Sequence, residues 1–379
     1  MSKAAILTIF RVSNYGSVLQ AYASQCLMER MGYDCVMIDY RYPNDWHYGK
    51  GAVRVYESPV KKLVKWVAGH FAAFPLHRLR HVISGFVQSR LHLTQPYDSL
   101  DALVSADWSE YDVVISGSDQ VWNPGYYYGD SVFMLSFVPD GVRKVSLASS
   151  MAVDMLPVTL EDKYRSLLSR FAALSVRELQ GEKIVLSQLG ITVPTRVMLD
   201  PTLLLSAQEW LKALSVSDSR FSGRRYIFLY LLSYAFSPQP YIYEVTACMK
   251  ERYGCDDVIA IGDNFDGIDE YLPGCKCVTG VSPCEFIRIV RDAECVVTSS
   301  FHGTAFAINF GRPLISVVND SGDDRQSSLL HKLDIMNCCA DMSADVESLN
   351  PEYEYTDVHQ QLSRLRNLDI AWLDRAIKG

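Results

Sequence analysis

The feature that most constrains this chain is a regular alternation of short apolar runs with segments of helical periodicity. An apolar run at residues 4–10 leads through a polar loop to apolar positions at helical spacing between 18 and 27, and a second apolar run follows at 35–38. Gly32 lies between the helix and the second run, where a glycine commonly ends a helix. This order of strand, helix and strand is a βαβ unit, so the sequence predicts an α/β fold with a mostly parallel sheet.

The alternation continues along the chain and starts afresh after Asp200-Pro201-Thr202. Further apolar runs lie at residues 113–116, 144–148, 172–176 and 197–199, and then at 226–232, 258–261, 295–298 and 314–318. Helical periodicity is found at 282–291, 302–310 and 358–377. A chain of 379 residues is also longer than one ordinary domain. We therefore predict an N-terminal α/β lobe at 1–205, a second at 206–345 and a helical tail at 346–379.

One segment departs from this pattern by its charge. Residues 41–95 hold nine Lys or Arg residues and two acidic ones, about +7, whereas the rest of the chain carries about −15. Apolar and basic residues interleave here as they do in basic amphipathic helices. We interpret the segment as an inserted helical pair that packs on the first lobe. Binding to an anionic membrane surface is the alternative.

Composition and charge argue against several classes of protein. A net charge of −8 disfavours nucleic-acid binding, which needs a basic face. The first apolar stretch ends at Arg11, too early for a signal peptide or a membrane span, so we expect a cytoplasmic protein. The ten cysteines lack paired C-x-x-C units, so we expect no metal site and mostly buried, reduced thiols. Cys275-Lys276-Cys277 is the one place where a metal or redox role stays open.

Polar clusters follow several of the predicted strands, where ligands bind in parallel sheets. The first cluster, Asn14-Tyr15-Gly16-Ser17, comes after the first strand, and the glycine allows close approach of the backbone to a ligand. Capping of the next helix by Ser13 or Asn14 would explain the asparagine but not the whole cluster. We interpret Asn14, Tyr15 and Gly16 as substrate-binding.

A second cluster, from Gly117 to Pro124, follows the apolar run at 113–116. It places Ser118, Asp119 and Gln120 close to an indole, and planar polar groups beside an aromatic face are suited to recognising sugar hydroxyls. Asp119 can in addition act as a base. Turn chemistry alone is the alternative explanation for the glycine, the aspartate and the Asn-Pro pair.

A third cluster, Ser175-Val176-Arg177-Glu178, ends the run at 172–176. The forked guanidinium of Arg177 can hold a carboxylate or a phosphate. The alternative is a surface ion pair with Glu178 or another nearby acid.

The sharpest signal is a strand that runs directly into a helix between Thr298 and Ala305. His302 lies where the helix begins, together with the small or hydroxyl-bearing Ser300, Gly303 and Thr304. Free backbone N–H groups and the helix dipole favour a phosphate at this place, and an imidazole there can donate a proton or bind the phosphate. The clusters lack G-x-G-x-x-G and Walker spacing, which disfavours dinucleotide and P-loop chemistry.

Taken in order, five sequence runs resemble the polysaccharide pyruvyl transferase family: NYGSVLQAYA, SGSDQVWNP, SVRE, LDPTLLL and SSFHGTAFAI. The resemblance extends from about residue 4 to about residue 333. The resemblance implies two Rossmann-like lobes in a glycosyltransferase-B-like arrangement, with the active site in the cleft between them. It further implies transfer of pyruvate from phosphoenolpyruvate to two sugar hydroxyls, which gives a ketal and releases phosphate. Phosphoenolpyruvate is then a donor substrate, and no cofactor is expected. By resemblance, the histidine and arginine of the family motifs carry over to His302 and Arg177.

One position departs from the family pattern. Some members have an arginine two residues before the motif histidine, where this chain has Ser300. Either Arg325 supplies the missing charge from the next loop, or the donor is a nucleotide sugar or another activated group. A glycan-binding relative without catalysis is a third reading. The expected partners are a small-molecule donor and a glycan acceptor, lipid-linked if the basic segment brings the enzyme to the inner face of a membrane.

Overall fold

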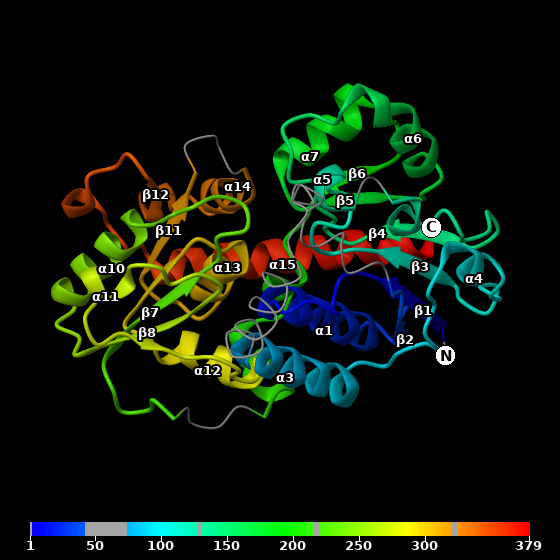
Figure 1. Cartoon of the computed structure of the whole chain (residues 1–379). Helices are drawn as coiled ribbons and strands as arrows, with labels where there is room; N and C mark the ends of the chain where they lie inside the picture. The colour runs from blue at the N-terminus through cyan, green and yellow to red at the C-terminus, as the bar shows by residue number, and fades with distance from the viewer. Residues whose placement is uncertain (1, 42–73, 128–129, 216–219, 320–323) are drawn as a thin grey trace, which may run out of the picture. The chain divides into compact units, whose positions relative to one another are not determined.

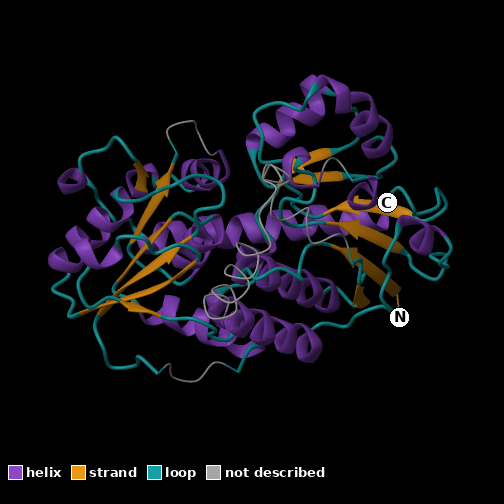
Figure 2. Cartoon of the chain, viewed as in Figure 1, coloured by secondary structure: helices purple, strands orange, loops and turns teal. Residues whose placement is uncertain are grey.

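The computed structural model describes residues 2–41, 74–127, 130–215, 220–319 and 324–379 (Figures 1 and 2). The chain divides into two compact units. Unit 1 comprises Met1–Asp200 and Leu373–Gly379, and unit 2 comprises Pro201–Trp372. Each unit contains parallel strands and helices, which confirms the predicted α/β fold.

Unit 1 is built on a four-stranded parallel sheet of order β2-β1-β3-β4, next to a two-stranded parallel pair, β5-β6. Bridges from Val145 to Ala173 and from Ser149 to Val176 connect the two sheets. The strands are β1 (Ser2–Leu7), β2 (Tyr33–Met37), β3 (Val113–Ser116), β4 (Arg143–Ser146), β5 (Leu174–Val176) and β6 (Thr195–Val197). The helices are α1 (Tyr15–Arg30), α3 (Phe74–Arg90), α4 (Leu100–Val104), α5 (Pro124–Tyr127), α6 (Val158–Leu168) and α7 (Leu179–Lys183).

The central strands of unit 1 are buried, which is why they stand out as apolar runs. All four residues of β3 and the last four of β1 are buried. Strands covered on both faces are continuously apolar rather than alternating. Gly32 has φ +91°, as expected for the glycine that ends α1.

The described part of the basic segment packs on unit 1. Ile83, Phe86 and Val87 of α3 are buried, and the ring of Phe86 meets the ring of Tyr22 edge-on at 5.5 Å between centroids. Figure 1 shows α3 beside α1, in agreement with this contact. The packing interpretation is therefore confirmed for α3, while residues 42–73 lie outside the described residues.

Unit 2 is built on a six-stranded sheet of order β12-β11-β10-β7-β8-β9, in which every neighbouring pair is parallel. Its strands are β7 (Tyr226–Leu231), β8 (Asp257–Gly262), β9 (Lys276–Cys277), β10 (Cys295–Thr298), β11 (Leu314–Val318) and β12 (Cys339–Asp341). Its helices are α8 (Pro201–Leu204), α9 (Ala207–Ala213), α10 (Tyr241–Arg252), α11 (Ile268–Tyr271), α12 (Pro283–Asp292), α13 (Phe301–Asn309) and α14 (Asp324–Lys332). The last helix, α15 (Tyr355–Lys378), drawn in red in Figure 1, begins in unit 2 and ends in unit 1.

Three further properties of the described residues bear on function. No helix among them is both long enough and apolar enough to cross a membrane. Within the same residues, no group of three or more His, Cys, Asp or Glu side chains is arranged to hold a metal ion. All ten cysteines are free thiols, but only four are buried, fewer than expected, and Cys277 is exposed.

Candidate functional site

The first predicted cluster forms the start of α1. The Oδ1 atom of Asn14 accepts hydrogen bonds from the backbone N–H groups of Gly16 at 2.8 Å and Ser17 at 3.4 Å, so Asn14 caps the helix. Tyr15 and Gly16 are buried in the first turn. Ser17, which the sequence analysis did not assign to the site, donates from its hydroxyl to Asp119 Oδ2 at 2.7 Å. The capping role of Asn14 is confirmed, and the same turn contacts the second cluster.

The second cluster is a tightly constrained loop after β3. Gly117 has φ +107°, and a Cβ atom there would lie 2.4 Å from Ser149 Oγ and 2.6 Å from the Leu147 carbonyl oxygen. Asp119 has φ 70°, a left-handed conformation that is uncommon for a residue other than glycine. Its carbonyl accepts from Ser150 N–H at 2.9 Å, which ties the loop to the chain after β4. Conformations of this kind cost about 1–3 kcal/mol and are concentrated at functional sites.

The neighbours of Asp119 differ in their surroundings. The hydroxyl of Ser118 is fully buried and lies 2.8 Å from the Ala148 carbonyl oxygen and 2.9 Å from Asp200 Oδ2. Gln120 is 7% exposed and its Oε1 accepts from Asn123 Nδ2 at 2.9 Å. Ser118 thus holds the loop to the interior, and Gln120 is oriented by the loop itself.

Arg177 follows β5 directly and is ion-paired. Its Nη1 donates to Asp200 Oδ2 at 3.1 Å and lies 3.7 Å from Asp119 Oδ1. An ion pair on the surface was one of the two expectations for this residue. The observed ion pair is instead buried, with 2% of the Arg177 side chain exposed. Its closer partner is Asp200 rather than Glu178. The sequence analysis did not assign Asp200, although it follows a predicted strand as the other site residues do.

Glu178 is a second buried acid beside this arginine. Its Oε1 accepts from the N–H groups of Met151 at 2.9 Å and Ala152 at 3.3 Å, and its Oε2 lies 4.0 Å from Arg177 Nε. Burial raises the pKa of the Glu178 carboxyl, and the nearby Arg177 and the hydrogen bonds oppose this rise. Four polar side chains thus meet where β3, β5 and β6 end, those of Ser17, Asp119, Arg177 and Asp200.

In unit 2 the predicted strand-to-helix junction is β10 followed by α13. Ser300 caps the helix, and its Oγ accepts from Gly303 N–H at 3.4 Å. His302 is the second helical residue, 6% exposed, with its ring edge-on to that of Phe301. A Cβ atom on Gly303 would lie 2.3 Å from Thr298 Oγ1 and 2.9 Å from Tyr230 Cδ1. The glycine is therefore required by the packing of α13 on the sheet.

The remaining predicted residues of unit 2 lie on either side of β11. Thr304 is fully buried, and its hydroxyl is 2.7 Å from that of Ser316. Gln326, which the sequence analysis did not identify, donates to the same Ser316 hydroxyl at 2.8 Å and so fixes the start of α14. Arg325 is the residue before it and is 8% exposed. That Arg325 supplies the positive charge missing at Ser300 stays a prediction.

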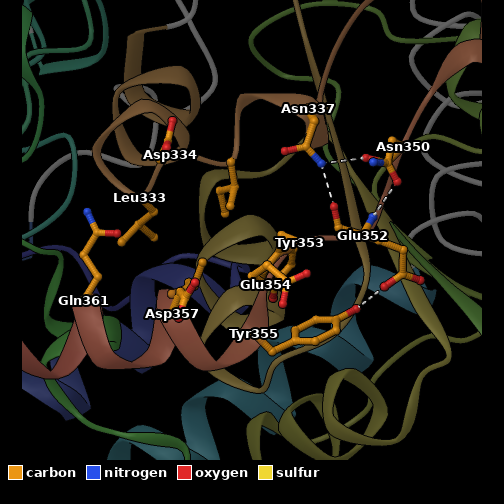
Figure 3. A pocket seen from close by; sticks show the side chains of 12 residues that line it. Leu333, Asp334, Asn337, Asn350, Glu352, Tyr353, Glu354, Tyr355, Asp357 and Gln361 are labelled. Carbon is orange, nitrogen blue, oxygen red and sulfur yellow. Dashed lines mark hydrogen bonds between the residues drawn. The ribbon is translucent and has the colours of Figure 1, made fainter.

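Figure 3 shows a pocket of unit 2 that none of the predicted site residues lines. Its volume is about 700 Å³, and four carboxylates line it, those of Asp334, Glu352, Glu354 and Asp357. None of its described lining residues is Lys or Arg. Because it would repel phosphate and carboxylate groups, we do not assign it to an anionic donor.

Comparisons with known proteins place this geometry in context. The family model described as polysaccharide pyruvyl transferase matches residues 14–321, a range that contains every predicted site residue except Arg325. No match was found among curated proteins.

Similar solved structures show the fold. A structure from E. coli of trehalose-6-phosphate bound with UDP-2-fluoro glucose has a TM-score of 0.51 at 8% identity, over 100% of this chain and 99% of that one. A trehalose-6-phosphate synthase has a TM-score of 0.51 at 9% identity, over 98% and 96% of the two chains. The match to a glycosyltransferase from Rickettsia africae has a TM-score of 0.47 at 10% identity, over 100% and 99%.

The two likenesses with a TM-score of 0.51 support an α/β fold of the glycosyltransferase-B class with two Rossmann-like units. The family match covers far more than half of the chain. This chain therefore belongs to the polysaccharide pyruvyl transferase family.

Proposed function

We propose that this protein is an enzyme that transfers pyruvate from phosphoenolpyruvate to two hydroxyls of a sugar in a surface or exported glycan. The products are a pyruvate ketal and inorganic phosphate. The observation that carries the proposal is the oriented carboxylate of Asp119, which lies beyond the end of β3 with Ser17 and Arg177 beside it. Membership of the family supports the choice of donor.

The reaction needs an acid, a base and groups that bind phosphate. The methylene carbon of the donor takes up one proton and becomes the methyl group of the ketal. One sugar hydroxyl attacks the adjacent carbon and loses its proton. The second hydroxyl then replaces the phosphate, and its proton leaves with the phosphate. We assign Asp119 as the base that accepts a hydroxyl proton and His302 as the acid or the phosphate ligand.

The other predicted residues form the substrate-binding surface of this proposal. The start of α13 is suited to the donor's phosphate, because the positive end of a helix dipole favours an anion. In unit 1 the binding residues are Asn14, Tyr15, Gly16, Ser118, Gln120 and Arg177, and in unit 2 they are Ser300, Gly303, Thr304 and Arg325. Phosphoenolpyruvate enters as a substrate, so the proposal needs no cofactor.

A second candidate function is transfer from a nucleotide sugar or another activated donor. It is favoured by Ser300, which stands where some family members carry an arginine suited to the anionic donor. It also agrees with the UDP-2-fluoro glucose in the similar E. coli structure. A glycan-binding relative without catalysis is the remaining reading.

We further propose a cytoplasmic enzyme whose basic segment, residues 41–95, brings it to a lipid-linked acceptor at the inner face of the membrane. Each Lys or Arg near an anionic surface contributes about 1 kcal/mol. Co-sedimentation with anionic vesicles is expected at low salt and not at high salt. Equal, negligible binding to anionic and neutral vesicles would leave only the packing role seen for α3.

The function is tested by comparing donors directly. In a thermal-shift screen, phosphoenolpyruvate should raise the unfolding midpoint and UDP-glucose should not. Phosphate release from phosphoenolpyruvate should then require a candidate glycan. Stabilisation by UDP-glucose alone would favour the second candidate function.

A further inference from the structure

Two thiols lie in contact at one edge of the sheet of unit 2, and the proposed reaction uses neither of them. Cys275 directly precedes β9, and Cys277 is the last residue of this strand. β9 is an edge strand of the six-stranded sheet and pairs with β8. Alternate residues of an extended segment point to the same face, and the side chains of Cys275 and Cys277 are hydrogen-bonded to each other. The motif Cys275-Lys276-Cys277 therefore brings two sulfur atoms together.

The two thiols differ in their surroundings. Cys277 is exposed, whereas Cys275 is half-buried and packs against the apolar core of unit 2. The hydrogen bond from Cys275 lowers the pKa of the Cys277 thiol, although partial desolvation and the carboxylate of Asp269 oppose this fall. The same hydrogen bond, together with burial, raises the pKa of the Cys275 thiol. Because the thiolate is the reactive form of cysteine, Cys277 is the nucleophile of the pair and Cys275 keeps its proton.

The described residues do not complete a metal site around this pair. Among them, no group of three or more His, Cys, Asp or Glu side chains is arranged to hold a metal ion. Lys276, between the two thiols, is ion-paired with Asp257. Structural zinc sites use four protein ligands. Of the two roles that the sequence left open for this motif, metal binding and redox chemistry, the donor set favours redox chemistry.

The spacing of the pair allows a disulfide. Two positions of an extended chain separate Cα atoms by at most about 7 Å, and disulfides join Cα atoms about 4.4–6.8 Å apart. A bond near the upper end of this range is strained, and strained or exposed disulfides are the ones that are easily reduced. A disulfide between Cys275 and Cys277 is therefore expected to be reversible.

We propose that Cys275 and Cys277 form a site of reversible oxidation by a peroxide, with Cys277 as the attacking thiol and Cys275 as the thiol that closes the disulfide. With hydrogen peroxide, the Cys277 thiolate attacks one oxygen and the O–O bond breaks, which gives a sulfenic acid and hydroxide. The Cys275 sulfur then displaces the sulfenic hydroxyl, and the S–S bond forms. The protons of the two thiols leave with the two oxygens as two molecules of water. The two sulfurs lose two electrons, which the peroxide gains.

The test maps the oxidised cysteines by mass spectrometry. The reduced full chain is treated with equimolar hydrogen peroxide, its remaining thiols are blocked with iodoacetamide, and it is digested with trypsin. Cleavage after Lys276 puts Cys275 and Cys277 into different peptides, which only a disulfide joins. Fragmentation separates this bond from one made by Cys255 or Cys284, which lie in the same two peptides. A bond between Cys275 and Cys277 that dithiothreitol reduces is the expected result.

Three variants assign the roles of the two thiols. In Cys275→Ser, the sulfenic acid at Cys277 should persist and react with dimedone, and in Cys277→Ser, Cys275 should stay reduced. The control is Cys248→Ser, which should behave as the wild type. Because burial raises the pKa of the Cys248 thiol, Cys277 should be oxidised at least about tenfold faster than Cys248 in the wild type.

Two outcomes would overturn the proposal. One is oxidation of Cys277 and Cys248 at equal rates, and the other is a disulfide from Cys277 to a cysteine other than Cys275. These measurements need neither phosphoenolpyruvate nor a glycan, so their result is independent of whether the proposed function holds.

Discussion

Substitution of Gly117 by alanine is expected to destabilise unit 1 and to displace Asp119. The φ of +107° at Gly117 is one that residues with a Cβ atom rarely adopt, and the new Cβ would lie 2.4 Å from Ser149 Oγ and 2.6 Å from the Leu147 carbonyl oxygen. The serine side chain can rotate, but the carbonyl belongs to the backbone and must shift. Backbone strain of about 1–3 kcal/mol and overpacking of about 1–3 kcal/mol together give about 2–6 kcal/mol.

Thermal unfolding and turnover measure this effect. In a unit of this size each kcal/mol lowers the midpoint by about 2–4 °C, so Gly117→Ala should lower it by at least about 4 °C. The matched control is Gly141→Ala in the same unit, because no atom lies within 4 Å of a Cβ at that position. Turnover should fall as well, since the loop that shifts carries Asp119. A midpoint within about 2 °C of wild type, together with unchanged turnover, would refute the reasoning.

Three further substitutions test single side chains. His302→Ala should lower turnover by about 10²–10⁴-fold, as loss of a general acid or base does; His331→Ala, at an exposed residue, is the control, and an unchanged rate in the folded His302 variant would exclude the role. Because burial raises the pKa of Glu178, the contribution of this carboxyl to stability is full below the ordinary value of 4.5 and is lost as pH rises through the raised pKa. Glu178→Gln should remove this part of the pH dependence of the unfolding midpoint, and identical pH curves for the two proteins would contradict it. Asn14→Ala should cost about 1 kcal/mol in urea unfolding through the lost helix cap, and no measurable loss would contradict the hydrogen bonds to Gly16 and Ser17.

The sequence predicted best those elements whose burial leaves a continuous apolar run. The strands at 295–298 and 314–318 were predicted with the bounds that β10 and β11 have, and every residue of both is buried. β9 (Lys276–Cys277) and β12 (Cys339–Asp341), at the two edges of the same sheet, were missed. Strands of two or three residues, of which only Ala340 is buried, are too short to show a period.

The candidate site was predicted where polar residues directly follow a strand, as with Asp119 and Arg177. Ser17 was included in the polar cluster after the first strand but not among the binding residues, and its contact with Asp119 spans 102 positions of the chain. Asp200 was noted as the start of a new alternation, although its place after a strand was a usable signal. Tertiary pairing of this kind cannot be derived from local pattern, because it depends on the order of strands in the sheet.

The most direct test of the central claim is the mass of the acceptor after reaction. A candidate glycan is incubated with the wild-type protein and phosphoenolpyruvate, with the Asp119→Asn variant as the control. The account predicts that the glycan gains the mass of one pyruvate less one water, in proportion to the phosphate released, and that the variant gives neither product at a comparable rate. Phosphate release without any change in the mass of the glycan, or addition of a sugar from UDP-glucose in place of pyruvate, would contradict it.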